Sequence, residues 1–355
     1  MKTVAKFEIE YLQYLNEHSE IVQKLPAFAD DLEHLKDLYR RMQRTRLLDA
    51  KAIVLQRTGK MGTYPSSLGQ EAISTGLGDA MRKEDVFCPY YRDQGALLER
   101  GVTQAEILSY WGGDERGADY QHAREDFPLC VPIATQCLHA CGVAFAFKYR
   151  KQPRVVVTAI GDGGTSEGDF YEALNLAGAW QLPVVFVINN NQWAISVPRG
   201  IQTNAATLAQ KGIAAGIPSL QVDGNDVIAV RDAVATAVEN ARTGGGPTLI
   251  EAISYRLCDH TTADDARRYW DEPTVTTARA KEPLIRLRAY LTAQNAWSDA
   301  EEEKMLNMLS EELDAAVKEY INKPAQPPES IMDFLYEELP EAMLDQRESV
   351  GVHHA

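Results

Sequence analysis

Two apolar runs near the middle of the sequence end in polar residues, and this pattern constrains the fold most. The run 155–160 is followed by Gly-Asp-Gly at 161–163, and the run 184–188 is followed by three asparagines at 189–191. Such short apolar runs are typical of strands buried on both faces of a parallel sheet. The carboxyl ends of neighbouring parallel strands meet at one edge of a sheet, where ligands bind. The sequence therefore predicts a carboxylate and amide oxygens at one binding edge.

These oxygen atoms suit a hard cation such as Mg²⁺, which is usually shared with substrate phosphates. The glycines allow a close approach of the backbone to an anion, and a helix expected from about Gly168 would add the positive end of its dipole. A diphosphate held by magnesium is thus the expected ligand. The alternative is that Gly-Asp-Gly is a turn and the asparagines are surface residues, since these residue types dominate turns.

Strands and helices alternate through the central part of the sequence. Strands separated by helices require a parallel sheet with helices on both faces, so an α/β fold is expected. The predicted strands cover 154–160, 184–189, 219–222 and 247–253. The predicted helices cover 134–149, 168–180 and 226–242.

Helical extensions are expected on both sides of this core. After an irregular leader over 1–29, Asp30 is placed to cap one long helix, or two in succession, reaching about Gly59. The segment 283–355 is predicted to be a helical extension packed on the core. Residues 30–282 would then form one ligand-binding domain.

The acidic composition excludes some partners. The formal net charge is −15, which disfavours nucleic acid and anionic membrane as partners. The sequence shows no secretory leader and no apolar run of membrane-spanning length. With five cysteines and no Cys-x-x-Cys pair, the thiols are expected to be reduced. A bacterial cytoplasm fits best, although a mature chain of the mitochondrial matrix would look the same.

The stretch 161–179 resembles the thiamine diphosphate motif in the alpha subunit of the 2-oxo acid dehydrogenases. The resemblance extends from about Leu38 to Pro340 and implies the thiamine diphosphate-binding fold. Further landmarks follow in the family's order: 55–60, 69–72, 91–93, 134–136, 222–226, 255–256 and 260–265. Within the family, 161–178 and 210–218 are closest to bacterial pyruvate dehydrogenases of the two-subunit type. Branched-chain 2-oxo acid dehydrogenases and acetoin dehydrogenase are the alternatives.

The resemblance implies how this chain would hold thiamine diphosphate and Mg²⁺. The side chains of Asp162 and Asn191 and the backbone carbonyl of Trp193 would bind the metal. The peptide N–H groups of Gly163 and Gly164 would face the diphosphate.

Other cofactor contacts implied by the resemblance come from two earlier segments. Tyr91 and Arg92 would donate side-chain hydrogen bonds to the diphosphate, and the backbone of Val131 and Ile133 would contact the aminopyrimidine. Asn189 stands where branched-chain relatives carry a phosphate-binding arginine, so one phosphate contact is expected to be weaker or missing.

His260 is expected to be both the catalytic histidine and a contact of the cofactor phosphates. It follows the predicted strand 247–253 in a polar loop, where histidine can change protonation near neutral pH. The neighbouring Asp259 is expected to raise its pKa. Tyr64 and Tyr91 are the candidate aromatic residues on the substrate side.

One part of a thiamine diphosphate site is missing from the sequence. No segment supplies the glutamate that activates the aminopyrimidine, so another polypeptide is expected to supply it. In the family this is a beta subunit in an α2β2 tetramer, which docks on a dihydrolipoyl acyltransferase core and serves its lipoyl domain. A 2-oxo acid, pyruvate first, is the expected substrate. A catalytically silent assembly subunit is the non-enzyme alternative.

Overall fold

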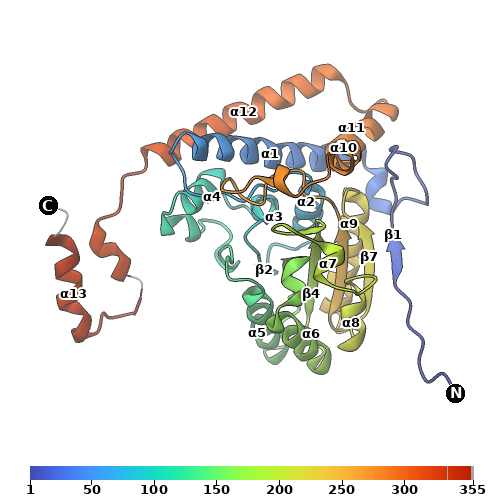
Figure 1. Ribbon diagram of the computed structural model, residues 1–355, viewed down its shortest axis with the longest axis horizontal. Coiled ribbons are helices and arrows are strands. Elements are labelled where there is room, and N and C mark those ends of the chain that lie inside the picture. Colours follow the sequence, from blue (N-terminus) through green and yellow to red (C-terminus); the bar gives the residue numbers. More distant parts are fainter. Residues whose placement is uncertain (334, 353–355) are drawn as a thin grey trace.

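A six-stranded parallel sheet forms the centre of the molecule (Figure 1). The computed structural model describes residues 1–333 and 335–352. The strand order is β1-β7-β8-β4-β3-β2, and every neighbouring pair is parallel. The strands are β1 (Glu10–Leu12), β2 (Val86–Cys88), β3 (Val156–Gly161), β4 (Val184–Asn190), β7 (Ser219–Asp223) and β8 (Thr248–Ile253).

Helices cover both faces of this sheet, because alternate residues of each strand point to opposite sides. Along β3, Val157 and Ala159 belong to one apolar cluster, whereas Val156 and Ile160 belong to the other. The first cluster includes α2 (Glu71–Asp79), α3 (Gln94–Glu99), α4 (Gln104–Trp111) and α9 (Val227–Arg242). The second includes α5 (Thr135–Tyr149) and α6 (Gly168–Trp180). The predicted α/β fold with helices on both faces is confirmed.

The helical extensions lie together against one end of the core (Figure 1). The long helix α1 (Leu32–Arg57) contacts α11 (Pro283–Ala293) and α12 (Asp299–Asn322), and all three contribute to a third apolar cluster. α10 (Glu272–Arg279) precedes α11 in the chain, and α13 (Glu341–Val352) packs on the turn 328–332, away from the sheet. The predicted helical extensions on both sides of the core are thus confirmed. The last three residues of the extension lie outside the described residues, and the domain limits at 29 and 282 remain predictions.

Two details of the N-terminal region differ from the sequence-based predictions. Asp31, not Asp30, caps α1, since its side chain accepts hydrogen bonds from the backbone N–H groups of Glu33 and His34. Asp30 instead ends a 3₁₀ turn. The segment 1–29 is not wholly irregular, because β1 pairs with β7 at the sheet edge. A three-residue strand is too short to show an alternating pattern in the sequence.

Within the described ranges, none of the helices combines the length and apolar character needed for a membrane crossing. All five cysteines are free.

The strand register determines where the binding edge forms. Gly161 at the end of β3 pairs with Asn189 near the end of β4, so the polar residues that follow both strands emerge side by side. Asp162 and Asn191 therefore share one edge, as the sequence predicts.

A buried aspartate connects the N-terminal segment to α9. One carboxylate oxygen of Asp226 accepts hydrogen bonds from the backbone N–H groups of Tyr14 and Leu15, at 2.7 and 2.8 Å. The other accepts from Ile228 and Ala229, at 3.0 and 3.3 Å, and so caps α9. Burial raises the pKa of Asp226 to about 6.

We expect Asp226→Ala to lower the free energy of unfolding by about 3 kcal/mol, because it removes a helix cap and leaves further buried N–H groups without an acceptor. Ser298→Ala is the matched control: Ser298 caps α12 on the surface, so about 1 kcal/mol is expected. Urea unfolding followed by circular dichroism measures both. Equal losses in the two variants would contradict the buried role of Asp226.

Candidate functional site

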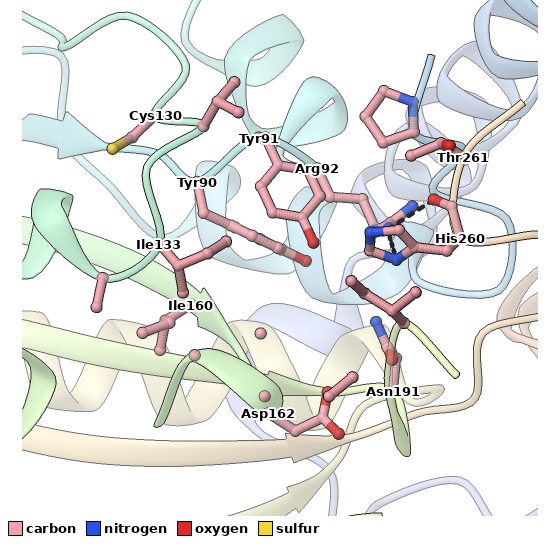
Figure 2. Close-up of a pocket in the computed structure, with 18 of the residues that line it drawn as sticks. Tyr90, Tyr91, Arg92, Cys130, Ile133, Ile160, Asp162, Asn191, His260 and Thr261 are labelled. Atoms are coloured by element: carbon pink, nitrogen blue, oxygen red, sulfur yellow. Dashed lines mark hydrogen bonds between the residues drawn. The ribbon is translucent and has the colours of Figure 1, made fainter. Parts of the chain in front are cut away.

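A pocket of about 570 Å³ opens at the carboxyl ends of β3 and β4. Its walls come from the segment after β2, the segment before α5, the segments that follow β3 and β4, and the loop that carries His260. Figure 2 shows Tyr91, Arg92 and His260 at one end of this pocket, Ile133 and Ile160 on another side, and Asp162 and Asn191 below.

The Asp162 carboxylate is buried, and the protein does not provide hydrogen bonds to both of its oxygen atoms. Its Oδ2 atom has no hydrogen-bond partner among the described residues. Burial raises the pKa of Asp162 to about 6, and backbone N–H groups together with Arg256 and Arg199 oppose this rise. A buried, unpartnered carboxylate oxygen is costly unless a ligand binds it. The atom is therefore a candidate ligand for a cation.

Asn191 is held so that its side-chain oxygen faces the turn beyond β4. Its Nδ2 donates to Gln70 Oε1 at 2.9 Å, and its Oδ1 accepts from the backbone N–H of Trp193 at 3.2 Å. The amide is thus oriented by two partners, and Oδ1 retains one lone pair for a further contact. Asp162, Asn191 and Trp193, the three predicted metal ligands, all line the same pocket.

Gly163 and Gly164 follow Asp162 in a tight turn where little space remains for a side chain. A Cβ atom on Gly163 would lie 2.6 Å from Ala194 Cβ, and one on Gly164 would lie 2.8 Å from a side-chain carbon of Ile160. Only glycine fits here without displacing a neighbour. Both glycines line the pocket.

Two guanidinium groups converge on His260. Arg92 Nη2 lies 3.3 Å from His260 Nδ1 and donates to the His260 backbone carbonyl at 3.0 Å. Arg256 Nη1 lies 3.4 Å from the same Nδ1 atom. Both arginines are buried. Among the described side chains, neither guanidinium forms an ion pair with a carboxylate, so this end of the pocket has an excess of positive charge.

The pKa of His260 is lowered to about 3, chiefly by burial and then by the positive charges of Arg92 and Arg256. The prediction that Asp259 raises this pKa is wrong. The Asp259 carboxylate instead accepts a hydrogen bond from the backbone N–H of Ala266. Asp264 is the carboxylate that opposes the lowering, and it accepts from the His260 backbone N–H at 2.9 Å.

Tyr91 lines the pocket beside His260, with its ring edge-on to the imidazole at a centroid distance of 6.2 Å. The preceding Tyr90 also lines the pocket and accepts a hydrogen bond from Asn189 Nδ2 at 3.0 Å. The side-chain oxygen of Asn189 accepts from Ser254 at 3.2 Å. Asn189 thus holds Tyr90 and is not among the residues that line the pocket. That one phosphate contact is weaker or missing stays a prediction.

Tyr64 does not reach the pocket, unlike the other predicted site residues. Its ring is fully buried and its hydroxyl donates to Asp49 at 3.1 Å. Its backbone exchanges two hydrogen bonds with Thr262, close to His260. The geometry gives Tyr64 a supporting position behind the loop, and its proposed contact with substrate stays a prediction.

Val131 and Ile133 lie at the rim, and their side chains are 50% and 47% exposed. Ile195, in the hairpin formed by β5 (Trp193–Ala194) and β6 (Val197–Pro198), also lines the pocket and is 57% exposed. The rim is thus apolar and open, which is unusual for a surface that faces only water.

Unusual backbone conformations gather around this pocket. Ala134, Gln192 and Ile195 have φ values of 68°, 73° and 55°, in the left-handed region that disfavours a β-branched residue such as Ile195. Strained backbone of this kind clusters at functional sites.

Arg256 is the residue that sequence reasoning missed. It belongs to the Tyr255-Arg256 landmark, but no role was assigned to it. Its guanidinium also donates to the Ile195 carbonyl at 2.9 Å and the Tyr269 hydroxyl at 2.7 Å. These partners come together only through the fold, so spacing along the chain gives no signal of them.

No group of three or more His, Cys, Asp or Glu side chains in the described ranges is arranged to hold a metal. The predicted metal ligands are not such a group, because they are one carboxylate, one side-chain amide and one backbone carbonyl. An open parallel sheet with a pocket at the ends of its central strands defines an α/β protein of the ligand-binding class.

Comparisons with known proteins agree with this class. Residues 39–329 match the model of the family described as dehydrogenase E1 component, so the chain belongs to that family. It is 39% identical over 350 residues to the pyruvate dehydrogenase E1 component subunit alpha of Staphylococcus epidermidis, covering 98% of this chain and 94% of that protein. The protein of the same name from Mycoplasma genitalium is 38% identical over 316 residues, covering 89% and 88%.

We expect Gly163→Ala to weaken binding of thiamine diphosphate at least about tenfold, because the new methyl group displaces Ala194 and overpacking costs about 1–3 kcal/mol. Gly168→Ala is the matched control, since a Cβ atom there meets nothing within 4 Å. Isothermal calorimetry measures both affinities. Equal affinities in the two variants would show that the turn at Gly163 is not part of the binding surface.

Proposed function

We propose that this chain is the alpha subunit of a thiamine diphosphate-dependent pyruvate dehydrogenase. The reaction is the oxidative decarboxylation of pyruvate with transfer of the acetyl group to a lipoyl group on a dihydrolipoyl acetyltransferase. The family membership and the names of the relatives support this proposal. The observation that carries it is the buried Asp162 carboxylate, whose Oδ2 atom lacks a partner among the described residues in a pocket shared with Asn191.

The oxygen atoms at the strand ends suit a metal ion. Asp162 and Asn191 present oxygen atoms from the ends of adjacent strands, and Mg²⁺ prefers oxygen ligands and binds phosphate oxygens as well. A divalent cation would neutralise the buried carboxylate and relieve its desolvation cost. The residues present therefore fit a magnesium ion, with the Trp193 carbonyl as a third protein ligand.

Positive charge near His260 suits the diphosphate. Arg92 lines the pocket, and guanidinium groups match phosphate oxygens well. Arg256 lies behind His260 and adds positive charge there, and neither arginine has an ion-pair partner in the described residues. Gly163 and Gly164 keep the backbone accessible from the opposite side. Cation and anion contacts thus lie within one pocket, as a magnesium diphosphate requires.

Thiamine diphosphate, when bound, supplies the carbon nucleophile for 2-oxo acid decarboxylation. The protein groups position and shield it. Tyr91 and Arg92 would donate hydrogen bonds to phosphate oxygens, and the backbone of Val131 and Ile133 would contact the aminopyrimidine. The apolar side chains of Ile133, Ile160 and Ile195 would exclude water. His260 would contact the phosphates and assist acyl transfer.

A beta subunit would complete the site. Asp162 and Glu167 are the carboxylates that line the described pocket, and both belong to the diphosphate-side segment after β3. The glutamate that activates the aminopyrimidine would therefore come from the partner. The apolar, exposed rim formed by Val131, Ile133 and Ile195 supports a partner covering the pocket in an α2β2 tetramer. We further propose a cytoplasmic location, which rests on the bacterial relatives.

The direct test is a panel of 2-oxo acids and acetoin with an artificial electron acceptor. The purified chain alone should turn over none of them, because it lacks the activating carboxylate. The complex with its beta subunit should oxidise pyruvate fastest. Preference for a branched-chain acid or acetoin would overturn the substrate assignment, and equal rates with and without the beta subunit would overturn the two-subunit assignment.

We expect Asp162→Ala to lower the magnesium-dependent affinity for thiamine diphosphate by about a hundredfold, because a desolvated charged partner contributes several kcal/mol. Glu172→Ala removes the same charge from the exposed face of α6 and serves as the control. Calorimetry on the assembled complex, with and without Mg²⁺, gives both affinities. Unchanged affinity in Asp162→Ala would exclude this residue as the metal ligand.

A further inference from the structure

The imidazole of His260 has two different ring nitrogens in this pocket. Nδ1 faces Arg92 at 3.3 Å and Arg256 at 3.4 Å. A guanidinium group is a donor only and stays protonated in proteins. A proton on Nδ1 would therefore point at two positively charged donors. Nδ1 must therefore accept hydrogen bonds from the guanidinium groups, and the ring proton must reside on Nε2.

Both arginines are fixed by further partners, so the arrangement is rigid. Arg92 also donates to the carbonyls of Ser66 and His260. Arg256 also donates to the carbonyls of Ile195 and Cys258 and to the Tyr269 hydroxyl. Neither guanidinium can turn away from the ring without losing several buried hydrogen bonds.

The negative groups near the ring compensate these charges only in part, because Asp264 opposes the lowering of the His260 pKa without reversing it. Asp264 lies on the same loop, but its carboxylate accepts hydrogen bonds from the His260 backbone N–H and from the Tyr269 hydroxyl. Asp259 accepts from the Ala266 backbone N–H. Tyr91 presents its ring edge, and Asp162 and Glu167 line other parts of the pocket.

The other nitrogen, Nε2, has no hydrogen-bond partner among the described residues, and His260 lines the pocket. We propose that Arg92 and Arg256 hold His260 as a neutral imidazole with its proton on Nε2, and that His260 serves as a hydrogen-bond donor to an anionic oxygen rather than as a general acid–base group. This inference rests on the proposed function for the identity of the anion, a phosphate or reacting oxygen. Arg256, which acts through His260, is a positioning residue.

The chemical consequence concerns what His260 can do during the reaction. A neutral imidazole that released its Nε2 proton would become an imidazolate, so full proton donation is unfavourable. Uptake of a proton at Nδ1 would place a third positive charge beside two guanidiniums. The role left to His260 is to stabilise a negative oxygen by hydrogen bonding, which neutral histidine does in other enzymes. The lowered pKa of His260, about 3, agrees with this geometry.

Histidine hydrogen–deuterium exchange read by mass spectrometry tests the protonation state directly, because it reports the titration of each histidine in a large complex. In the α2β2 complex freed of cofactor, His260 should remain neutral down to at least about pH 5, below the ordinary histidine value of about 6.5. Arg256→Met should shift its midpoint upward by at least about one unit, since one positive neighbour is lost.

Arg267→Met is the matched control for this measurement. Arg267 lies on the same loop, is exposed and pairs with Asp265, so its removal should leave the His260 midpoint unchanged. His139, on the exposed side of α5, gives an internal reference in the same digest. A His260 midpoint near 6.5 in the native complex, or an equal shift in both variants, would overturn the proposal.

A second experiment separates hydrogen-bond donation from acid–base catalysis. His260→Ala should slow single-turnover acyl transfer to the lipoyl domain about a hundredfold, the scale for loss of one donor. The amide N–H of glutamine can replace Nε2–H, so His260→Gln should transfer the acyl group at least about tenfold faster than His260→Ala. If Gln is as slow as Ala, and the native rate shows an inflection between pH 6 and 7 that both variants lose, His260 is an acid–base group.

The experiments distinguish a failure of the proposed function from a failure of the proposal on His260. A native complex that binds no thiamine diphosphate by calorimetry and oxidises no 2-oxo acid would refute the function, while the exchange measurement would still decide the state of His260. Melting temperatures of the variants within a few degrees of the native complex would show that folding is intact.

Discussion

The parallel pairing of β3 with β4 is the constraint on which the rest of the site depends. Because Gly161 pairs with Asn189, the two strands end together and their following residues emerge at one edge of the sheet. Apolar side chains on both faces of these strands fix that register, since a slip of one residue would turn each strand's buried side chains to the other face. The neighbourhood of Asp162 and Asn191 is thus a consequence of core packing.

Charge imbalance is the second feature that links structure to function. A buried carboxylate with an unpartnered oxygen and the Arg92 guanidinium line the pocket, and the Arg256 guanidinium lies beside His260. Neither arginine has an ion-pair partner in the described ranges. A bound magnesium diphosphate would satisfy both at once. Such a ligand binds the folded state alone and so would stabilise it in proportion to the logarithm of its concentration. Arg92, which would receive phosphate, also fixes the proton position on His260 together with Arg256, so cofactor binding and the chemistry of His260 are coupled.

The sequence predicted the core of the fold because continuous apolar runs mark its buried strands and helices alternate with them. The limits of α6 were predicted to the residue, and β3 and β4 within two residues. The strand β1 and the helices α2, α3 and α4 were missed because they are short or buried all round. The site residues near Gly-Asp-Gly followed from local sequence. The contacts of Arg256 with Ile195 and of Tyr64 with Thr262 join segments far apart in the chain, and so spacing alone did not reveal them. Asp259 accepts from Ala266 on the same loop, and this depends on loop conformation, which the sequence pattern does not specify.

In the proposed function, this chain binds the diphosphate end of the cofactor through a metal and Arg92, with His260 and Arg256 beside them. A competition titration tests it most directly: magnesium pyrophosphate and unphosphorylated thiamine are each added to the α2β2 complex loaded with thiamine diphosphate, and displacement is followed by calorimetry. Pyrophosphate with Mg²⁺ should displace the cofactor, and Arg92→Met should weaken the binding of both ligands. Displacement by thiamine but not by magnesium pyrophosphate would contradict the account, because binding would then reside in the aromatic half of the cofactor.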